Sequence, residues 1–435
     1  MTDWIASCGV PLHGDVVVPG DKSVSHRAIM MGAIAEGITR IEGFLEGEDT
    51  RATAAIFRQL GVRIDAPSAG VRIVHGVGLH GLRGSNEPLD CGNAGTAMRL
   101  LTGLLVGQAF DSTLVGDGSL SQRPMRRVID PLAALGARID SDNGCAPLCI
   151  RGGQPLHGTQ IDLTVASAQL KSAVLLAGLY AAGETRVTEP HPTRDYTERM
   201  LTAFGVACEF APGFATVRGG TMLRGTDVQV PADFSSAAFF LVAATLVPGS
   251  ELLLRQVGMN PRRTGLLHVL RMMGADITEE AASVQGGEPV CDLRIRHAPL
   301  HGIEVPVEHV PDMIDEFPIL FVAAACAKGA TIVRGAAELR VKESDRIAVM
   351  AAGLRTLGIR IDETPDGATI QGGRLHGSAS VIASHDDHRI AMAFAVAAQL
   401  TDSDVLIGDV ANVATSFPGF DDLARSVGFG LRNRD

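Results

Sequence analysis

Apolar and polar residues follow the same order in six successive segments of the chain. Each segment starts with a short polar loop, continues into an alanine-rich run that is apolar on all sides, and then reaches a stretch rich in β-branched residues. A run that is apolar all round predicts a buried α-helix, and the β-branched stretch predicts a strand. The predicted helices begin near Ser25, Ala94, Ala168, Ser235, Asp315 and His388.

A second helix in each segment is predicted from a recurring ending. Sequences such as LGVRID at 60–65 and LGIRID at 357–362 place a glycine directly before an alternating strand. A glycine just past a helix is typical of a C-cap. Each segment is therefore predicted to contain a strand, a helix, a strand, a helix and one or two further strands. The glycines of these endings are Gly61, Gly136, Gly205, Gly274, Gly358 and Gly428.

The alternation of helices and strands predicts an α/β fold. The chain length predicts two domains, because 435 residues exceed what one hydrophobic core usually serves. Three segments would form each domain, the first spanning 21–231 and the second joining 1–20 to 232–435. The chain would cross between them near 19–22 and 229–233. Both crossings contain proline, and we expect them to act as hinges, although ordinary turns are the alternative.

Composition narrows the class of protein. The net charge of −11 argues against a nucleic-acid partner. Seven scattered cysteines without a C-x-x-C pair indicate reduced thiols in a cytoplasmic protein.

The N-terminus does not have the features of a signal peptide, and the longest apolar run, 237–247, is too short to span a membrane. Metal candidates are weak, at Cys145, Cys149 and His157 and in the His/Asp run 385–388, and we expect no metal.

Lysine is rare in this chain. Of 38 basic residues only Lys22, Lys171, Lys328 and Lys342 are lysines. An ammonium group is compact and strongly hydrated, so the remaining lysines are candidates for positions where a planar guanidinium would not serve. Lys22, Lys171 and Lys342 lie in polar stretches with serine or arginine ahead of apolar runs, which is typical of anion sites. Chance is the alternative, most of all for Lys171.

Further polar residues lie at the predicted starts of the buried helices. If these helices share one orientation, their free N–H groups can converge on a cleft between the domains. Helix capping is the alternative for each Ser, Asp or Asn, and we favour it for Asp233, Ser235 and Ser236. Charged residues near these helix starts strengthen the prediction of a ligand site. Arg123 is one of them, and Lys342, Glu343 and Arg346 form a group of three. For that group, a solvated surface of ion pairs is the alternative.

Several phrases of the sequence together resemble the 5-enolpyruvylshikimate-3-phosphate synthase family. They are PGDKSVSHRA, GNAGTAMR, QRPM, ASAQLKSA, IDEFP, LRVKESDR, DDHRIAM and TSFP, and the resemblance runs from residue 17 to about residue 428. It implies the enolpyruvyl transferase fold, a two-domain inside-out α/β barrel of six βαβαββ repeats, three per domain.

The resemblance also implies a reaction. The carboxyvinyl group of phosphoenolpyruvate would move to the 5-hydroxyl of 3-phosphoshikimate, with release of phosphate, on the route to chorismate and the aromatic amino acids. No cofactor is implied, and we expect a monomer. Asp315 would be the base for the 5-hydroxyl, with Asp312 as its rival, whereas Glu343 and Lys22 would exchange protons with the methylene group.

Ligand contacts are implied residue by residue. The residues expected to bind 3-phosphoshikimate are Lys22, Ser23, Arg27, Ser167, Ala168, Gln169, Arg194, Asp315 and Lys342. Those expected to bind phosphoenolpyruvate are Lys22, Asn93, Gly95, Arg123, Gln169, Arg346 and Arg389.

Three residues depart from the commonest pattern of the family. Ala168, Arg194 and Thr415 stand where many members have serine, tyrosine and lysine, as in a divergent bacterial subgroup. They put some contacts to 3-phosphoshikimate in doubt and make Arg194 a replacement ligand. They also leave competitive inhibition by glyphosate open, since Gly95 favours room for it and the subgroup resemblance argues against it.

Three other functions compete with this interpretation. The sister enzyme that acts on UDP-N-acetylglucosamine usually carries a reactive cysteine where Gly118 stands. An RNA 3′-phosphate cyclase would need a nucleotide and a catalytic histidine, and the acidic net charge disfavours RNA. A scaffold protein would gain nothing from so many cations and carboxylates at one cleft.

We expect that Lys22→Arg abolishes normal turnover, although arginine replaces lysine almost everywhere else in the chain. The reason is that the bulkier planar guanidinium cannot take the place of a compact ammonium beside two anions. Steady-state rates of both proteins measure this, and an arginine variant with ordinary rates would contradict the argument from lysine scarcity.

Overall fold

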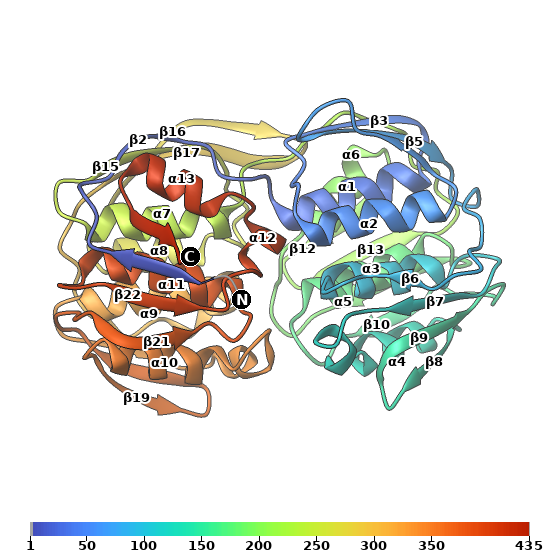
Figure 1. Cartoon of the computed structure of the whole chain (residues 1–435). Helices are drawn as coiled ribbons and strands as arrows, with labels where there is room; N and C mark the ends of the chain where they lie inside the picture. The colour runs from blue at the N-terminus through green and yellow to red at the C-terminus, as the bar shows by residue number, and fades with distance from the viewer. Residues whose placement is uncertain (1–2, 435) are drawn as a thin grey trace. The chain divides into compact units, whose positions relative to one another are not determined.

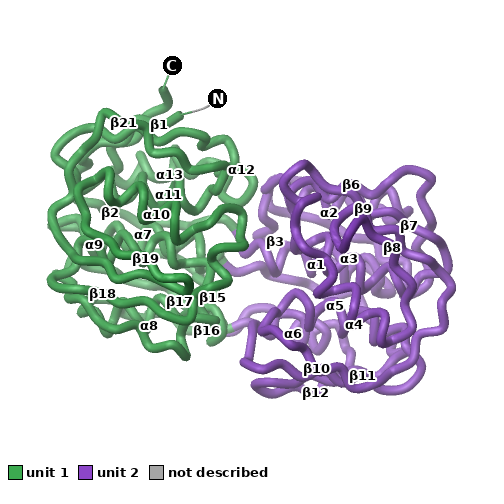
Figure 2. The backbone as a smooth tube through the Cα atoms, turned by 90° about the horizontal axis from the view of Figure 1, so that it is seen from below, with its two compact units in different colours: residues 1–19, 232–283, 289–435 green, residues 20–231, 284–288 purple. Residues whose placement is uncertain are grey.

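The computed structural model describes residues 3–434 and divides the chain into two compact units (Figure 2). Unit 1 consists of Met1–Pro19, Ala232–Ser283 and Pro289–Asp435, and unit 2 of Gly20–Pro231 and Val284–Glu288. Each unit has a hydrophobic core of its own. The chain therefore passes between the units not only near 19 and 231 but also on both sides of the segment Val284–Glu288, which the sequence did not predict.

Unit 2 contains the first three repeats (Figure 1). The first consists of α1 (Lys22–Ile34), β3 (Glu36–Glu42), α2 (Glu48–Gln59), β4 (Arg63–Asp65) and β5 (Val71–Val77). The second consists of β6 (Leu89–Asp90), α3 (Gly95–Leu105), β7 (Ser112–Val115), the 3₁₀ helix η1 (Leu120–Gln122), α4 (Arg126–Ala134), β8 (Arg138–Asp142) and β9 (Cys145–Arg151). The third consists of β10 (Gln160–Asp162), α5 (Ala168–Gly178), β11 (Glu184–Thr188), α6 (Tyr196–Ala203), β12 (Cys208–Ala211) and β13 (Phe214–Arg218), and β14 (Val228–Gln229) follows.

Unit 1 contains β1 (Trp4–Ser7), β2 (His13–Val16) and the other three repeats. The fourth consists of α7 (Phe234–Leu246), β15 (Glu251–Gly258), α8 (Gly265–Met272), β16 (Asp276–Gln285) and β17 (Glu288–Arg296). The fifth consists of η2 (Val307–His309), η3 (Pro311–Met313), α9 (Phe317–Cys326), β18 (Ala330–Val333), η4 (Ala337–Val341), α10 (Arg346–Thr356), β19 (Arg360–Thr364) and β20 (Gly367–Gln371). The sixth consists of β21 (Ser378–Ala383), α11 (His388–Ala397), η5 (Ala398–Leu400), β22 (Val405–Gly408), α12 (Val413–Ser416), α13 (Phe420–Val427) and β23 (Gly430–Asn433).

The sheets confirm the six βαβαββ repeats and reveal a strand order that the sequence did not. In the second repeat the order is β6-β7-β9-β8, with β6 parallel to β7 and the remaining pairs antiparallel. In two other repeats, the first strand of the same order comes from a segment far away in the sequence. β14 is the parallel first strand beside β3, and β2 is the parallel first strand beside β15. β1 lies between β22 and β23, antiparallel to both.

The first helix of each repeat lies at the centre of its unit. In unit 1 the helices α7, α9 and α11 contact one another, and every residue of α7 is buried. A helix surrounded by other helices must be apolar on all sides, as the sequence predicted. The second helices are amphipathic, and α13 buries only Phe420, Ala424 and Val427. Helices inside and sheets outside are the arrangement of an inside-out α/β barrel.

The predicted C-cap glycines are confirmed, because all six have positive φ, from 83° at Gly205 to 119° at Gly428. Two predicted helix starts were less accurate. α1 begins at Lys22 rather than near Ser25, because the Asp21 side chain accepts a hydrogen bond from the Val24 amide at 2.9 Å. α9 begins at Phe317, so Asp315 precedes the helix instead of starting it.

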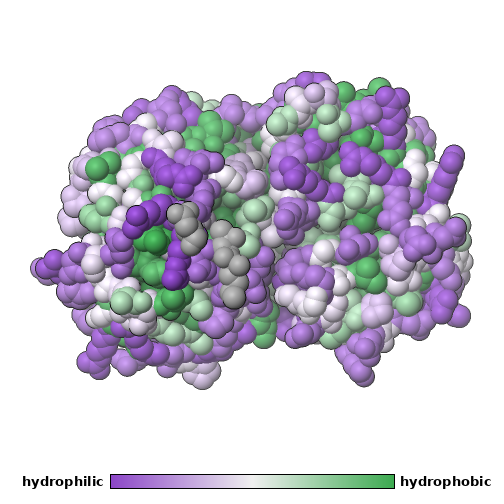
Figure 3. All heavy atoms as spheres, viewed as in Figure 1, coloured by the Kyte–Doolittle hydropathy of each residue, from purple (hydrophilic) through white to green (hydrophobic). Residues whose placement is uncertain are grey.

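On the face shown in Figure 3, hydrophilic residues cover most of what is visible, with small apolar areas among them. Within the described part of the chain, no helix combines the length and the apolar character needed to cross a membrane.

Close packing between α3 and α5 predicts an unusual effect of Gly103→Ala. A Cβ atom at Gly103 would lie 2.1 Å from the carbonyl oxygen of Ala173 and 2.6 Å from its Cα atom. Alanine normally stabilises a helix interior by about 1 kcal/mol relative to glycine. Here the α5 backbone has to move, so we expect a loss of at least about 2 kcal/mol in the free energy of unfolding.

Denaturant unfolding measures this change. Gly373→Ala is the matched control, since its Cβ would meet only Ile359 Cδ1 at 3.5 Å, and we expect a change within about 0.5 kcal/mol. A stabilised Gly103→Ala protein would contradict the packing argument.

Candidate active site

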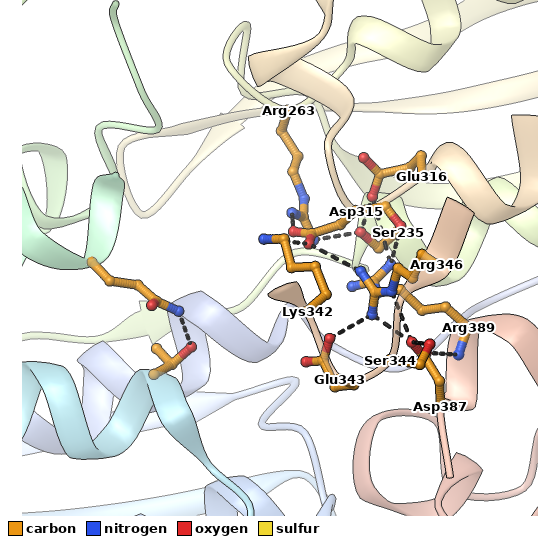
Figure 4. Close-up of polar contacts among 12 residues, drawn as sticks. Ser235, Arg263, Asp315, Glu316, Lys342, Glu343, Ser344, Arg346, Asp387 and Arg389 are labelled. Carbon is orange, nitrogen blue, oxygen red and sulfur yellow. Dashed lines mark hydrogen bonds and ion pairs between the residues drawn. The ribbon is translucent and has the colours of Figure 1, made fainter. Parts of the chain in front are cut away.

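Charged side chains gather in unit 1 around the loops that precede α9, α10 and α11 (Figure 4). We call this group the Asp315 cluster. Its members are Ser235, Arg263, Asp315, Glu316, Lys342, Glu343, Ser344, Arg346, Asp387 and Arg389. The predicted residues Asp315, Lys342, Glu343, Arg346 and Arg389 are thus brought together by the fold.

Arg346 is the buried centre of the cluster. Its side chain is 1% exposed and donates to Asp387 Oδ2 at 2.8 Å and to Glu343 Oε2 at 2.7 Å. Burial would raise the pKa of Asp387, but the guanidinium of Arg346 holds it below its usual value. Burial would likewise lower the pKa of Arg346, and Asp387 with Glu343 raises it instead. Both groups of the Arg346–Asp387 pair are therefore charged.

The structure rules out a solvated surface of ion pairs on one helix as the explanation for Lys342, Glu343 and Arg346. Lys342 and Glu343 lie in the loop between η4 and α10 and not on a helix, and α10 begins at Arg346. Arg346 is fully buried rather than on the surface. The Arg346–Glu343 pair forms nonetheless, across the start of the helix.

Three cations surround the carboxylate of Asp315, and a fourth binds its backbone oxygen. Its Oδ2 atom accepts a hydrogen bond from Arg263 Nη1 at 2.9 Å. Its Oδ1 atom lies 3.7 Å from Lys342 Nζ and 3.7 Å from Arg346 Nη1. Its backbone oxygen accepts from Arg389 Nη1 at 3.1 Å. The site thus places a carboxylate, a group that can serve as a general base, among cations suited to anionic ligands.

Arg263 and Glu316 were missed by the sequence analysis. Arg263 lies two residues after Pro261, in a charged loop before α8 that contains no lysine to draw attention to it. Glu316 stands beside Asp315 and is 2% exposed. Burial raises the pKa of Glu316 above its usual value.

The capping interpretation is confirmed for Asp233 and incomplete for Ser235. The side chain of Asp233 accepts from the Ser235 amide at the start of α7. The Ser235 hydroxyl instead donates to Glu316 Oε1 and accepts from Arg263 Nη2. Ser235 therefore belongs to the charged network.

In unit 2, Lys22 stands at the first position of α1. Its ammonium lies 2.5 Å from Asp49 Oδ2, an ion pair that the sequence did not predict. Asp21 caps the helix and also accepts from the hydroxyl of Tyr196 at 3.1 Å. The helix start thus combines a half-buried ammonium with the partial positive charge of a helix N-terminus.

The fold brings Asn93 and Arg123 together, and both were predicted to belong to the same site. Arg123 Nη2 donates to Asn93 Oδ1 at 2.7 Å. Gly95 lies beside them, and a Cβ atom there would be 3.2 Å from Arg123 Nη1 and 3.1 Å from Arg99 Nη1. A larger residue at Gly95 would press on both guanidinium groups.

Gln169 joins the starts of α3 and α5. Its amide donates to Thr96 Oγ1 at 2.7 Å and its oxygen accepts from Arg99 Nη1 at 2.7 Å. Ser167 and Ala168 precede it, and the Ser167 side chain does not cap the helix. Arg99 was not predicted, because it lies inside an apolar run.

Arg27 is almost fully buried among hydroxyl groups. It is 3% exposed and donates to Thr197 Oγ1, Ser172 Oγ and the Ser23 carbonyl. Burial lowers the pKa of Arg27 to about 10, which still leaves it charged at neutral pH. The nearby Arg194 is half-buried.

Lys171 is an ion-pair residue of the core, which decides against the anion-site hypothesis for it. Its ammonium lies 2.9 Å from Glu189 Oε1 and 2.9 Å from Glu198 Oε1, all three side chains being 4% exposed or less. Burial would lower the pKa of Lys171, but Glu198 and Glu189 raise it.

Both groups of side chains are suited to anionic ligands and proton transfer. Among residues 3–434, no three or more His, Cys, Asp or Glu side chains form a cluster that could hold a metal ion. The cations Lys22 and Arg123 in unit 2, and Lys342 and Arg389 in unit 1, stand at or close to helix starts, where backbone N–H groups add to the positive field.

Comparison with known proteins identifies extensive similarity. The profile of the family EPSP synthase (3-phosphoshikimate 1-carboxyvinyltransferase) matches residues 7–423. The 3-phosphoshikimate 1-carboxyvinyltransferase of Xanthomonas axonopodis pv. citri (strain 306) is 68% identical over 429 residues, covering 98% of this chain and 97% of the relative. That of Xanthomonas campestris pv. campestris (strain B100) is 67% identical over 432 residues, covering 99% and 98%.

Solved structures are similar as well. EPSP synthase from Acinetobacter baumannii superposes with a TM-score of 0.91 at 50% identity, covering 100% of both chains. The enolpyruvyl transferase NikO from Streptomyces tendae superposes with a TM-score of 0.81 at 19% identity, covering 100% of this chain and 99% of the other, which supports the fold alone.

We expect Lys171→Ala to lower the free energy of unfolding at neutral pH by about 3–5 kcal/mol, because it leaves Glu189 and Glu198 buried without their cation. Lys328→Ala is the control, since that lysine is exposed, and should change stability by less than about 0.5 kcal/mol. Denaturant unfolding of both variants measures the difference. Weakened substrate binding at unchanged stability would instead make Lys171 a ligand.

Proposed function

Because this chain belongs to the EPSP synthase (3-phosphoshikimate 1-carboxyvinyltransferase) family, we propose that it transfers the carboxyvinyl group of phosphoenolpyruvate to 3-phosphoshikimate. The 5-hydroxyl accepts the group and phosphate leaves, a step in the synthesis of chorismate and the aromatic amino acids. The observation that carries this proposal is the 68% identity to a relative of that name over nearly the whole chain. The alternative acceptor, UDP-N-acetylglucosamine, has no comparable support.

The chemistry requires a base, an acid and several cations. The 5-hydroxyl loses its proton as its oxygen bonds to C2 of phosphoenolpyruvate, while the methylene carbon gains a proton. The tetrahedral intermediate then loses a proton from the new methyl group, and the bond between C2 and the phosphate oxygen breaks. Both substrates are anions, so cations must offset their mutual repulsion.

We assign the base for the 5-hydroxyl to Asp315. Lys342 and Arg346, both 3.7 Å from Asp315 Oδ1, are the cations implied for the two substrates. The rival Asp312 is 9% exposed and paired with Arg262 at 3.4 Å. A base must reach both the hydroxyl and the cations that bind its substrate, which favours Asp315. Glu343 and Lys22 are proposed to exchange protons with the methylene carbon.

Ligand contacts are proposed from the same residues that the sequence indicated. Those for 3-phosphoshikimate are Lys22, Ser23, Arg27, Ser167, Ala168, Gln169, Arg194, Asp315 and Lys342. Those for phosphoenolpyruvate are Lys22, Asn93, Gly95, Arg123, Gln169, Arg346 and Arg389. The hydrogen bonds of Gln169 to Thr96 and of Arg123 to Asn93 support these sets, because they bring residues of α3, α5 and the η1 loop together.

Domain roles are proposed as well. Residues 21–231 would bind the phosphate side of 3-phosphoshikimate, and 1–20 with 232–435 would supply the base. The crossings near 19–22 and 229–233 would act as hinges, since binding two anions with residues from both domains favours closure. We further propose a cytoplasmic monomer, which seven free thiols favour over a disulfide-bonded secreted protein.

Glyphosate is proposed as a competitor of phosphoenolpyruvate. Gly95 leaves room beside Arg123 and Arg99, which favours inhibitor binding. An inhibition constant measured against phosphoenolpyruvate decides between this and the resistance that Ala168 and Arg194 would suggest.

Phosphate release tests the proposed reaction. The protein is mixed with phosphoenolpyruvate and 3-phosphoshikimate, and in a parallel reaction with phosphoenolpyruvate and UDP-N-acetylglucosamine. We expect phosphate and the enolpyruvyl product only in the first mixture. Release in the second alone would overturn the assignment of the acceptor.

We expect Asp315→Asn to keep the affinity for both substrates within about threefold while turnover falls by about 10²–10⁴-fold, the usual contribution of a general base. Asparagine keeps the shape of the side chain but cannot accept the proton. Asp312→Asn is the matched variant and should retain turnover within about tenfold of the parent protein. Calorimetric titration and steady-state kinetics measure both, and the reverse pattern would transfer the role to Asp312.

A further inference from the structure

Arg263 is a buried arginine whose two terminal nitrogens bind different elements of unit 1. Its side chain is 6% exposed. Nη1 donates to Asp315 Oδ2 at 2.9 Å, whereas Nη2 donates to Ser235 Oγ at 2.5 Å and to Asp233 Oδ1 at 3.3 Å. The guanidinium therefore connects the start of α7 to the loop that carries Asp315, and Figure 4 shows it reaching this loop.

The contacts of Asp315 are asymmetric. Oδ2 lies against Arg263, while Oδ1 lies toward Lys342 and Arg346, at 3.7 Å from each. A carboxylate can rotate about its Cβ–Cγ bond, and a hydrogen bond from a buried, planar guanidinium restricts that rotation. The bond to Arg263 thus fixes the orientation of the carboxylate, with one oxygen bound and the other directed toward the two cations.

We infer that Arg263 is a positioning residue for the base Asp315: it binds one carboxylate oxygen so that the other is held toward the substrate-binding cations. This inference rests on the proposed function, in which Asp315 accepts the proton of the 5-hydroxyl. General-base catalysis depends on such orientation, and a shift of about 1 Å can cost about 10²-fold in rate.

Several contacts hold the Arg263 side chain in its position. Asp233 caps α7 and binds Arg263, and Ser235 binds both Arg263 and Glu316. Glu316 follows Asp315 directly in the chain. The loop before α9 is therefore held to α7 by two bridges, one through Arg263 and one through Ser235, which is the rigid support that a catalytic carboxylate needs.

Its surroundings distinguish Arg263 from a substrate ligand. Both of its terminal nitrogens are hydrogen-bonded to protein side chains, to Asp315 on one side and to Ser235 and Asp233 on the other. Nη1 of the likewise buried Arg346, by contrast, makes no hydrogen bond to the described residues. Lysine could supply the charge but not the planar fork that reaches Asp315 and Ser235 at once. The geometry, and not the charge alone, is the function assigned here.

The test compares Arg263→Ala, Arg263→Lys and the adjacent control Arg262→Ala in the full-length protein. Arg262 is 33% exposed and paired with Asp312, so its removal leaves the contacts of Asp315 in place. Turnover, KM for each substrate, the affinity for 3-phosphoshikimate and the thermal midpoint are measured for all three.

We expect turnover of Arg263→Ala to fall by about 10²-fold with both KM values within about threefold of the parent protein. Arg263→Lys should lose about tenfold in turnover with the same KM values, because it keeps the charge but not the fork. Arg262→Ala should keep turnover within about threefold. A side chain that only stabilised the fold would lower the thermal midpoint without this separation of turnover from KM.

Three results would overturn the inference. They are normal turnover in Arg263→Ala, a raised KM at unchanged turnover, and an equal loss of turnover in Arg262→Ala. If Arg263→Ala does not fold, Arg263→Lys decides by the same criteria. Failure of the proposed base is separate, because it would appear as normal turnover in Asp315→Asn. Failure of this inference alone would leave the turnover of Asp315→Asn lowered by about 10²–10⁴-fold.

Discussion

A helix that is enclosed by other helices cannot carry unpaired charges along its length, and the architecture of this protein follows from that constraint. The first helix of each repeat is central and largely apolar, and its charged residues lie within its first two turns. The repeated topology places the starts of these helices together within each unit, as the contact of Gln169 with Thr96 and that of Arg389 with Asp315 demonstrate. Burial of the helices thereby concentrates the charged chemistry at one end.

Charges that do enter the interior are paired. Lys171 lies between Glu189 and Glu198, and Arg346 binds Asp387. Removing one partner from such a pair typically costs about 3–5 kcal/mol, because the other charge stays desolvated. These pairs connect neighbouring elements, α5 with α6 in one unit and α10 with α11 in the other. They hold in place the helix starts that carry the residues proposed to bind the substrates.

The scarcity of lysine drew attention to positions where an ammonium group makes specific contacts, but it did not show what each ammonium group contacts. Lys22 and Lys342 stand beside carboxylates at or near helix starts, with side chains about one quarter exposed, as suits contact with a ligand. Lys171 has the same local sequence character, but it points into the core and binds two glutamates. The difference arises from residues 18 and 27 positions further along the chain, which no local pattern could connect to Lys171.

Periodicity and glycine placement were sufficient to predict the six repeats, because helix burial and C-cap geometry are local properties. The family resemblance then indicated the residues of the candidate site. What local sequence could not determine was long-range pairing: the insertion of β1 between β22 and β23, the role of Ser235 beside Glu316, and the contact of Arg263 with Asp315. These depend on which surfaces meet when the repeats pack, and only the tertiary structure decides that.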